Sequence, residues 1–187
     1  MSEPESDEDL VTRAQAGEKA AFERLVQKYY EVVVTAAYTV LANVDAAKDC
    51  AQDALMEAAQ NLAKLRDKNK FDRWIYGIAR NKAKYYLQRQ HLHSEAMKVK
   101  TDESRRLKPV ASPSEQLSKN EQLDSIRRAL SEVPEIYREV LVLKYIDQRS
   151  HEDIARLLDI SLAAVDKRLM RGKAMLRESL GRWKGEN

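Results

Sequence analysis

Four cations near the C-terminal end of the chain are spaced as if they lay on the outer surface of one helix. Val165 and Leu169 stand four residues apart and can both face inward, which leaves the rest of that surface to polar side chains. A helix with an apolar back and a cationic front can lie in the major groove of DNA, where cations bind phosphates and base edges. A solvated helical hairpin with a basic outer face is the alternative. The cations are Lys167, Arg168, Arg171 and Lys173.

The elements that would position these cations form a predicted helix-turn-helix over residues 150–173. Ser150 can cap the first helix, and Asp153 three residues later fits a capped helix start. Asp159 interrupts the helical pattern and tolerates the left-handed backbone angles that a tight turn between crossed helices requires. Ile160 is expected to fill the corner, and Ser161 to cap the second helix. The glycine that usually occupies such a turn is absent.

A second set of cations is interleaved with aromatic residues on a helix predicted from near Phe71 to about Gln90. Several polar side chains fall within about an 80° stripe at 100° per residue, opposite an apolar face that includes Trp74 and Ile78. Cations that follow a backbone, with rings that stack on unpaired bases, suit single-stranded nucleic acid. Tyrosines half-buried at a helix rim, beside solvated cations, would give the same pattern. The stripe consists of Arg73, Tyr76, Arg80 and Lys84, and Tyr85, Tyr86 and Arg89 extend it.

Carboxylates recur along residues 45–65. Small and apolar residues between Ala47 and Leu62 repeat at helical spacing and predict a narrow inner stripe, with Asp45 as the N-cap. The carboxylates lie mostly on the other faces of this helix. They are either an ordinary solvated surface or a docking surface for a basic partner. They include Asp49, Asp53 and Glu57, with Gln52 among them.

The composition favours an all-helical protein with one or two small cores. The chain has 187 residues, is 43% hydrophobic, and contains only five glycines and four prolines. Its one cysteine, Cys50, excludes an intrachain disulfide and suggests a reducing compartment. The acidic N-terminus has no signal-peptide pattern, and no apolar run reaches membrane-spanning length, so we expect a cytoplasmic protein without membrane insertion.

The sequence contains no pattern typical of an enzyme or a cofactor site. It has no glycine-rich phosphate loop, no histidine–carboxylate metal box, and no nucleophile beside a plausible base. His91 and His93 stand two residues apart without further ligands nearby, which is a weak indication of a metal. We therefore expect no enzymatic activity, no cofactor and no metal.

Prolines and polar residues interrupt the helical pattern in the middle of the chain. Residues 91–119 show no sustained period and are too long for a tight connection inside one core, which predicts a flexible linker. The predicted boundaries are then 1–90 for a first small helical domain and 120–187 for a second, which contains the helix-turn-helix.

Several stretches resemble the extracytoplasmic-function (ECF, group IV) sigma factors of bacterial RNA polymerase, and they follow one another in the order found in that family. Residues 7–30 look like the opening of the sigma-2 domain, and residues 45–65 are similar to its polymerase-docking helix. Residues 71–86 look like its promoter-melting helix, with the run Trp-Ile-x-x-Ile-Ala-Arg-Asn intact. Residues 130–176 resemble the sigma-4 domain.

The resemblance implies a sigma-2-like helical bundle and a sigma-4-like helix-turn-helix domain. It implies a factor that directs core RNA polymerase to specific promoters and assists strand opening, in a stress or envelope response.

The clamp helices of the polymerase would meet Asp45, Asp49, Gln52 and Asp53, and the second domain would also touch the polymerase flap. The −10 element would meet Lys68, Asn69, Arg73, Tyr76, Arg80, Asn81, Lys84 and Tyr85. The −35 element would meet Ser161, Ala163, Ala164, Asp166, Lys167, Arg168, Arg171 and Lys173. Such factors are commonly held inactive by an anti-sigma protein, and the resemblance implies one here.

The sequence departs from the family pattern at a few places. The recognition helix often begins with Gly-Thr-Val-Lys, whereas residues 163–166 are Ala-Ala-Val-Asp, which leaves the −35 preference open. Ala59 stands where the docking helix often has Trp. Gly172 replaces an expected Ala and should loosen its helix by about 0.5–1 kcal/mol.

Two other functions remain as alternatives. In one, the C-terminal domain binds a duplex operator without polymerase, and residues 1–90 sense a signal or dimerise. The stripe of Arg73 to Lys84 argues against this, because a sensor domain has no use for it. In the other, the chain is a helical interaction module with no nucleic-acid role.

Overall fold

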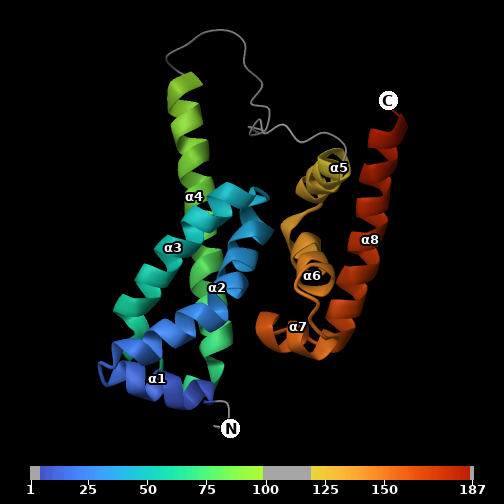
Figure 1. Ribbon diagram of the computed structural model, residues 1–187. Coiled ribbons are helices and arrows are strands. Elements are labelled where there is room, and N and C mark those ends of the chain that lie inside the picture. The colour runs from blue at the N-terminus through green and yellow to red at the C-terminus, as the bar shows by residue number, and fades with distance from the viewer. Residues whose placement is uncertain (1–4, 99–118, 186–187) are drawn as a thin grey trace.

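The structure is a computed structural model that describes the backbone of residues 5–98 and 119–185, and the side chains of residues 5–90 and 125–182. Within these residues the chain forms α-helices and short 3₁₀ helices and no strand, which confirms the predicted all-α fold. The N-terminal half contains α1 (Asp7–Gln15), α2 (Lys19–Leu41), α3 (Val44–Asn61), η1 (Leu62–Lys64), η2 (Lys68–Lys70) and α4 (Phe71–Lys98). The C-terminal half contains α5 (Lys119–Glu132), α6 (Glu135–Tyr145), α7 (His151–Leu158) and α8 (Leu162–Gly185). Figure 1 shows the two halves side by side.

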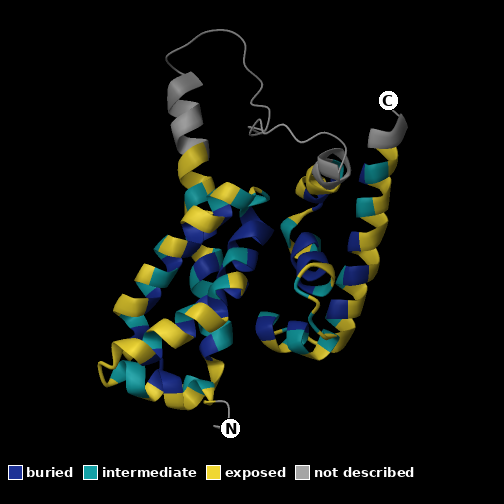
Figure 2. Ribbon diagram, in the orientation of Figure 1, coloured by how far each residue is buried: buried dark blue, intermediate teal, exposed yellow. Residues whose placement is uncertain are grey.

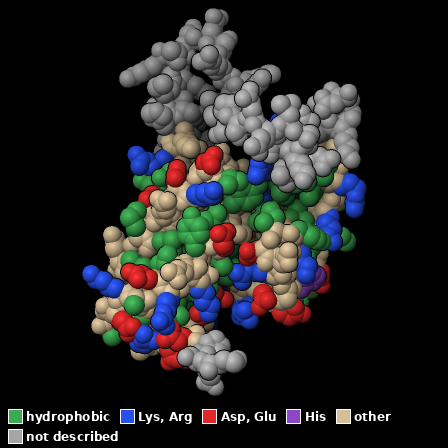
Figure 3. Space-filling view, viewed as in Figure 1, with side chains coloured by type: hydrophobic (Ala, Val, Ile, Leu, Met, Phe, Trp, Pro, Cys, Tyr) green, Lys and Arg blue, Asp and Glu red, His purple; other side chains and the backbone are tan. Residues whose placement is uncertain are grey.

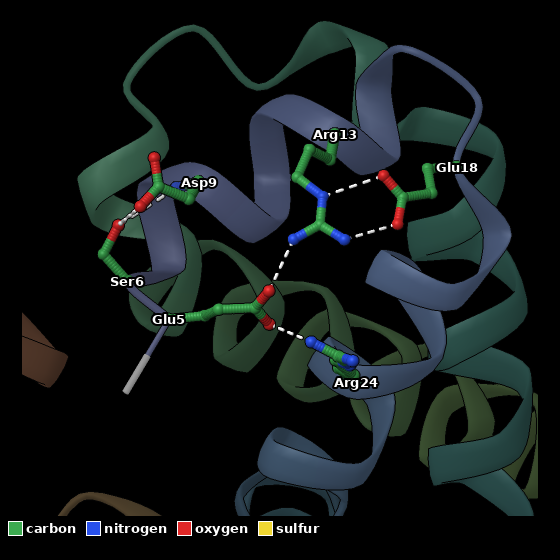
Figure 4. A network of polar contacts seen from close by, with 6 residues as sticks. All are labelled: Glu5, Ser6, Asp9, Arg13, Glu18 and Arg24. Atoms are coloured by element: carbon green, nitrogen blue, oxygen red, sulfur yellow. Dashed lines mark hydrogen bonds and ion pairs between the residues drawn. The ribbon is translucent and has the colours of Figure 1, made fainter. Parts of the chain in front are cut away.

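The start of α1 is fixed by a cap and a cluster of ion pairs (Figure 4). The N-cap is Ser6, and its hydroxyl accepts a 3.1 Å hydrogen bond from the Asp9 N–H. The Arg13 guanidinium joins Glu5 to Glu18, and its hydrogen bonds to the Glu18 carboxylate lower the pKa of that group. Gly17 follows α1 with φ of 96°, a backbone conformation that glycine adopts without strain.

The second helix is the centre of the N-terminal half. It contacts α1, α3 and α4, and its inner side chains, among them Leu25 and Val33, are fully buried. Residues 32–35 are all β-branched, and such residues have a weak helix propensity. They are helical here because their side chains pack in the core, and packing outweighs propensity. Tyr29 meets Phe71 of α4 edge-on, with ring centroids 5.1 Å apart.

A stripe of small residues lets α3 lie close against its neighbours, as the sequence predicts. The helix begins at Val44, and its N-cap is Asn43 rather than the predicted Asp45, since the Asn43 side chain accepts a 2.9 Å bond from the Ala46 N–H. The fully buried residues of the stripe are Ala47, Cys50, Ala51, Ala54 and Ala58 (Figure 2).

Helix α6 is the centre of the C-terminal half, as α2 is of the N-terminal half. Val140 and Leu143 are fully buried, and they join a cluster with Ile154 of α7 and Val165 of α8. Pro134 occupies the N-cap of α6. Helix α8 approaches α6 closely at Gly172, because glycine has no side chain to hold the two helices apart.

The long fourth helix differs most from the prediction. It was expected to end near Gln90, but its backbone remains helical to Lys98. Residues 99–118, most of the predicted linker, lie outside the described residues, and so do the side chains of His91 and His93. The flexible linker therefore stays a prediction.

The two halves share a continuous core. A single cluster of buried residues includes Leu25 and Ile75 from one half and Val140 and Leu157 from the other. Helices α2 and α4 supply the contacts on one side, and α6 and α7 supply them on the other. In the space-filling view, hydrophobic side chains gather across the middle of the face that both halves share (Figure 3). No helix in the described ranges is long and apolar enough to span a membrane.

Candidate nucleic-acid interface

The C-terminal half contains the predicted helix-turn-helix in α7 and α8. The Ser150 hydroxyl caps α7 by accepting a 3.0 Å hydrogen bond from the Asp153 N–H. Asp159 ends α7 in the left-handed region, with φ of 56° and ψ of 49°, as expected for a turn without glycine. The Ser161 hydroxyl accepts a 3.2 Å bond from the Ala164 N–H at the start of α8, and Ile160 packs against the core.

The outer face of α8 is open to solvent at most of the predicted −35 positions. Its back is buried through Val165 and Leu169. Asp166 is exposed and lies 2.9 Å from the ring nitrogen Nδ1 of His151. The Lys173 ammonium stands over the Tyr145 ring, 5.2 Å from its centroid. The exposed positions are Ser161, Ala163, Asp166, Lys167, Arg171 and Lys173, whereas Ala164 and Arg168 are half-buried.

The predicted stripe on α4, which we call the α4 stripe (Arg73, Tyr76, Arg80 and Lys84), does share one face of the helix. That face is turned toward the C-terminal half, and each of its four side chains contacts a carboxylate there. Arg73 pairs with Asp159 in the turn of the helix-turn-helix. The Arg80 guanidinium lies 2.8 Å from a carboxylate oxygen of Glu135 and 3.1 Å from one of Glu139, and the Lys84 ammonium lies 3.3 Å from Glu135.

Tyr76 is the member of the α4 stripe that the structure buries. Its side chain is 2% exposed, and its hydroxyl donates a 3.0 Å hydrogen bond to the Glu139 carboxylate. Glu139 itself is 1% exposed, so burial raises the pKa of its carboxyl, while the neighbouring Arg80 charge and the Tyr76 hydrogen bond lower it less strongly. The amphipathic pattern indicates which residues share a face, but it cannot tell whether another part of the chain covers them.

The other predicted −10 residues lie around this contact and are more open. The Lys68 ammonium donates a 2.8 Å hydrogen bond to the Thr12 hydroxyl, and Asn69 beside it is exposed. Asn81 is exposed, and so is Tyr85, whose ring lies 5.8 Å from the Arg89 guanidinium carbon. Asn69, Asn81 and Tyr85 are therefore open to solvent, whereas the donors of the α4 stripe are paired with carboxylates of the C-terminal half.

The acidic face of α3 is also uncovered. Asp45, Asp49 and Gln52 are exposed, whereas Asp53 is half-buried and accepts a 3.3 Å hydrogen bond from the Tyr86 hydroxyl. Met56, one turn beyond Gln52, is 58% exposed and adds an apolar side chain to this face, which the sequence analysis did not identify. The signal in the sequence was that Met56 stands four residues after Gln52, because residues four apart lie on the same face of a helix.

The sequence analysis also missed the polar residues of α6. Glu135, Arg138 and Glu139 lie on the side of α6 that faces α2 and α4, where they bind donors or acceptors of the other half. A signal was present, because Arg138 and Glu139 directly precede an apolar run, residues 140–143, and charges among core residues are rare unless paired. Among the described residues, no group of three or more His, Cys, Asp or Glu side chains is placed to hold a metal ion.

Comparison with known proteins identifies both halves. Sigma-70 region 2 matches residues 25–92, and Sigma-70, region 4 matches residues 123–176. The ECF RNA polymerase sigma factor SigW of Bacillus subtilis is 30% identical over 91% of this chain and 94% of its own length. The ECF RNA polymerase sigma-E factor of Escherichia coli is 30% identical over 92% of this chain and 93% of its own length.

Two solved structures have the same fold. CnrH, in complex with the cytosolic domain of CnrY, superposes with a TM-score of 0.66 at 23% identity, over 95% of this chain and 99% of that one. The sigma factor RpoE of Bartonella quintana, in complex with the anti-sigma factor NepR, gives a TM-score of 0.57 at 22% identity, over 86% of this chain and 96% of that one. The matches to both sigma-70 regions and the relatives at 30% identity show that the chain belongs to the ECF sigma factors, which act in the initiation of transcription by bacterial RNA polymerase.

Proposed function

We propose that α4, together with the η2 loop before it, holds the opened strand of a −10 promoter element. The α4 stripe would follow the strand backbone with its cations, and Tyr85, which is 55% exposed, is available to stack on an unpaired base. Lys68 and Asn69 lie in the loop where a flipped base would be bound. Unstacking costs a few kcal/mol per base step, and contacts to the unpaired bases offset that cost.

The C-terminal half would read the −35 duplex with α8 in the major groove. The support is the exposed cationic face of α8, carrying Lys167, Arg171 and Lys173, on a helix whose back is buried. Asp166 on the same face can accept a hydrogen bond from a cytosine N4 amino group. The Asp166 carboxylate contacts His151 at the surface of the helix-turn-helix.

Both halves would act while bound to core RNA polymerase. The exposed row of Asp45, Asp49 and Gln52 on α3 suits the clamp helices, and the C-terminal half would contact the flap. Holding two small DNA-binding bodies on one enzyme makes the second promoter contact effectively intramolecular, which raises the apparent affinity of the chain for the promoter. Because the polymerase acts on chromosomal DNA, we infer a cytoplasmic location.

One observation supports this proposal most. A single chain carries a cation–aromatic helix suited to an opened strand and, separately, an exposed helix-turn-helix suited to duplex DNA. An operator-binding regulator needs only the second, and an interaction module needs neither.

The test is reconstituted transcription. We expect the chain and core polymerase to co-elute in gel filtration, and the mixture to transcribe from promoters mapped after overexpression of the chain. The D45N/D49N variant should lose co-elution, whereas E23Q/E31Q, which removes two exposed carboxylates from α2, should retain it. If the unmodified chain does not associate with core polymerase, the proposal is wrong.

The −35 contact has its own test. Replacing Lys167 and Arg171 by Ala should weaken binding of the holoenzyme to all promoter duplexes and reduce the salt dependence of binding, because phosphate contacts are lost. The K19A/K64A variant removes two cations from the N-terminal half and is the control. Equal loss in both variants would contradict a role for the α8 surface.

We also propose an anti-sigma protein as a regulatory partner. The support comes from RpoE of Bartonella quintana, which has a similar fold and was solved in complex with the anti-sigma factor NepR. The hydrophobic band across the face shared by the two halves is a surface on which a partner could bind both (Figure 3). Purification of the tagged chain from its native cell should recover one additional protein in stoichiometric amount, and recovery of the chain and polymerase alone would contradict the proposal.

A further inference from the structure

The loop that would bind a flipped base lies against α1. This loop, residues 65–70, which we call the η2 loop, connects the end of η1 to the start of α4, and α1 contacts both η1 and η2. Its last five residues are all polar, so the loop has few apolar side chains with which to fix its own shape. Ordering such a segment costs conformational entropy, which contacts from another element must offset.

Gln15, the last residue of α1, holds the start of the η2 loop. Its side-chain nitrogen Nε2 donates a 2.9 Å hydrogen bond to the Leu62 carbonyl and a second, also 2.9 Å, to the Leu65 carbonyl. Leu62 stands at the end of α3, where helix carbonyls lack a partner within their own helix, and Leu65 has an extended backbone. One amide group therefore fixes both the point at which the chain leaves α3 and the direction in which it enters the loop.

Thr12, one turn earlier on α1, holds the middle of the η2 loop. The Lys68 ammonium donates a 2.8 Å hydrogen bond to the Thr12 hydroxyl, which in turn donates to the Glu8 carbonyl over 2.7 Å. This contact directs the Lys68 side chain toward α1, whereas the neighbouring Asn69 is exposed. The Asn69 amide offers a donor and an acceptor together, which is the combination that pairs with the edge of a base.

Helix α1 is itself firmly attached, so it can act as an anchor for the loop. Val11 is fully buried. The Asp7 carboxylate accepts hydrogen bonds from α2, one of 2.7 Å from the Lys28 ammonium and one from the Tyr29 hydroxyl. The Tyr29 ring also packs against Phe71, the first residue after the loop. Both ends of the η2 loop are therefore attached to the body that α1 and α2 form.

We propose that Gln15 and Thr12 are positioning residues for base recognition: they hold the η2 loop in one shape, so that Asn69 is presented to a flipped base before that base arrives. The inference rests on the proposed role of the loop, and it names α1 as the element that shapes it. A loop that already has its bound shape loses less conformational entropy on binding. A loop with many shapes could fit several bases, so the defect expected without α1 contacts is weaker discrimination between bases.

Substitutions of similar size remove these hydrogen bonds with little change in volume. The Q15M variant loses both amide donors, and T12V replaces the hydroxyl by a methyl group. T12S keeps the hydroxyl and should restore the behaviour of the unmodified chain. The Q27M variant makes the same change as Q15M at an exposed position of α2 and is the matched control.

Amide hydrogen exchange of the free chain, read by mass spectrometry, reports the shape of the loop. We expect residues 65–70 to exchange about tenfold faster in Q15M and about threefold faster in T12V than in the unmodified chain, because hydrogen bonds that hold the loop are lost. T12S and Q27M should match the unmodified chain. Exchange in α2 should be the same in all four variants, which shows that they are folded.

Base discrimination is measured with each variant bound to core polymerase. The probes are a fluorescein-labelled oligonucleotide with the −10 strand of a promoter mapped after overexpression, and a set in which one −10 base at a time is replaced. We expect Q15M to lower the preference for the natural base about threefold to tenfold at one position, and T12V to lower it at that same position. Affinity for oligo(dT) of equal length should stay within about twofold, because phosphate contacts carry no sequence information.

The two measurements separate failure of this inference from failure of the proposed function. Faster loop exchange in Q15M without any loss of base preference would mean that the η2 loop does not bind the flipped base, so the proposed role of the loop would be wrong. Equal loop exchange in Q15M and Q27M would overturn the positioning role of Gln15 while leaving the proposed role of the loop intact. Equal behaviour of T12V and T12S in both measurements would overturn the role of Thr12.

Discussion

The Arg138 guanidinium of α6 lies against the C-terminal end of α2, where its Nε donates a 2.8 Å hydrogen bond to the Thr39 carbonyl. These residues are 99 positions apart in the sequence and belong to different halves of the chain. The Arg138 side chain is 7% exposed, and burial lowers its pKa, so the charge is held there by its carbonyl acceptors. The contact between the halves is therefore specific and polar as well as apolar.

Loss of this side chain should be costly. We expect R138A to lower the free energy of unfolding by about 2–4 kcal/mol, because it leaves buried carbonyls of α2 and α5 without donors. Urea denaturation followed by circular dichroism measures this. The R177A variant makes the same chemical change at an exposed position of α8 and should stay within about 0.5 kcal/mol of the unmodified chain. Equal stabilities for R138A and R177A would show that the Arg138 contacts contribute nothing.

Helix propensity alone predicts that replacing Gly172 by Ala stabilises the chain, whereas the packing around Gly172 predicts the opposite change in the free energy of unfolding. A Cβ added there would lie 3.1 Å from Leu141 side-chain atoms and 3.3 Å from the Tyr137 carbonyl oxygen, inside the contact between α8 and α6. We expect G172A to destabilise the chain by about 1 kcal/mol, because overpacking outweighs the gain in helix propensity. An added Cβ at Gly181 on the same helix meets nothing within 4 Å, so G181A should stabilise by about 0.5–1 kcal/mol. Stabilisation by both would show that α6 and α8 can move apart freely.

Cys50 should be chemically silent in the folded chain. Burial raises the pKa of its thiol to about 11, with a smaller contribution from the Asp53 charge. At pH 8 only about one thiol in a thousand would be the reactive thiolate, and the side chain is inaccessible as well. Iodoacetamide should therefore modify Cys50 slowly in buffer and rapidly in concentrated urea. Equal rates in both solvents would contradict its burial.

Glu139 should make stability depend on pH in a defined direction. Burial raises the pKa of its carboxyl in the folded chain, against the opposing effects of Arg80 and Tyr76, and Glu135 and Arg168 also act on it from α6 and α8. A group with a raised pKa binds its proton more tightly when folded, so its stabilising effect is complete at low pH and is lost as the pH rises through the raised value.

The E139Q variant isolates this effect because glutamine does not titrate. The free energy of unfolding of the unmodified chain, relative to E139Q, should be greatest below about pH 4.3, the ordinary pKa of glutamate, and should decline at higher pH. Urea titrations of both proteins from pH 4 to pH 8 provide the comparison. A constant difference over this range would mean that burial does not perturb the Glu139 carboxyl.

Much of the local structure could be predicted from sequence because it depends on neighbouring residues. Ser150, Asp159 and Ser161 specify the helix-turn-helix through capping and a left-handed turn, all within one short segment. Helix ends were harder to predict: the N-cap of α3 is Asn43, two residues before the predicted Asp45, since several nearby polar side chains could serve.

The relation between the halves could not be predicted in the same way. Periodicity places Arg73, Tyr76 and Arg80 on one face of α4, and the structure agrees. What covers that face comes from residues 55 to 86 positions away, and no local pattern encodes such a pairing. The charged residues of α6, next to an apolar run, were the overlooked sign that this surface meets another polar one.

The most direct test of the account is the distance between the halves during initiation. Nitroxides attached at Gln60 of α3 and Glu178 of α8, both exposed, would report it by pulsed electron spin resonance in the full chain. We predict one narrow distance distribution for the free chain and a longer distance once core polymerase and a promoter with an opened −10 strand are bound. An unchanged distance in a complex that produces transcript would contradict the account, because the α4 stripe would then support initiation while still covered.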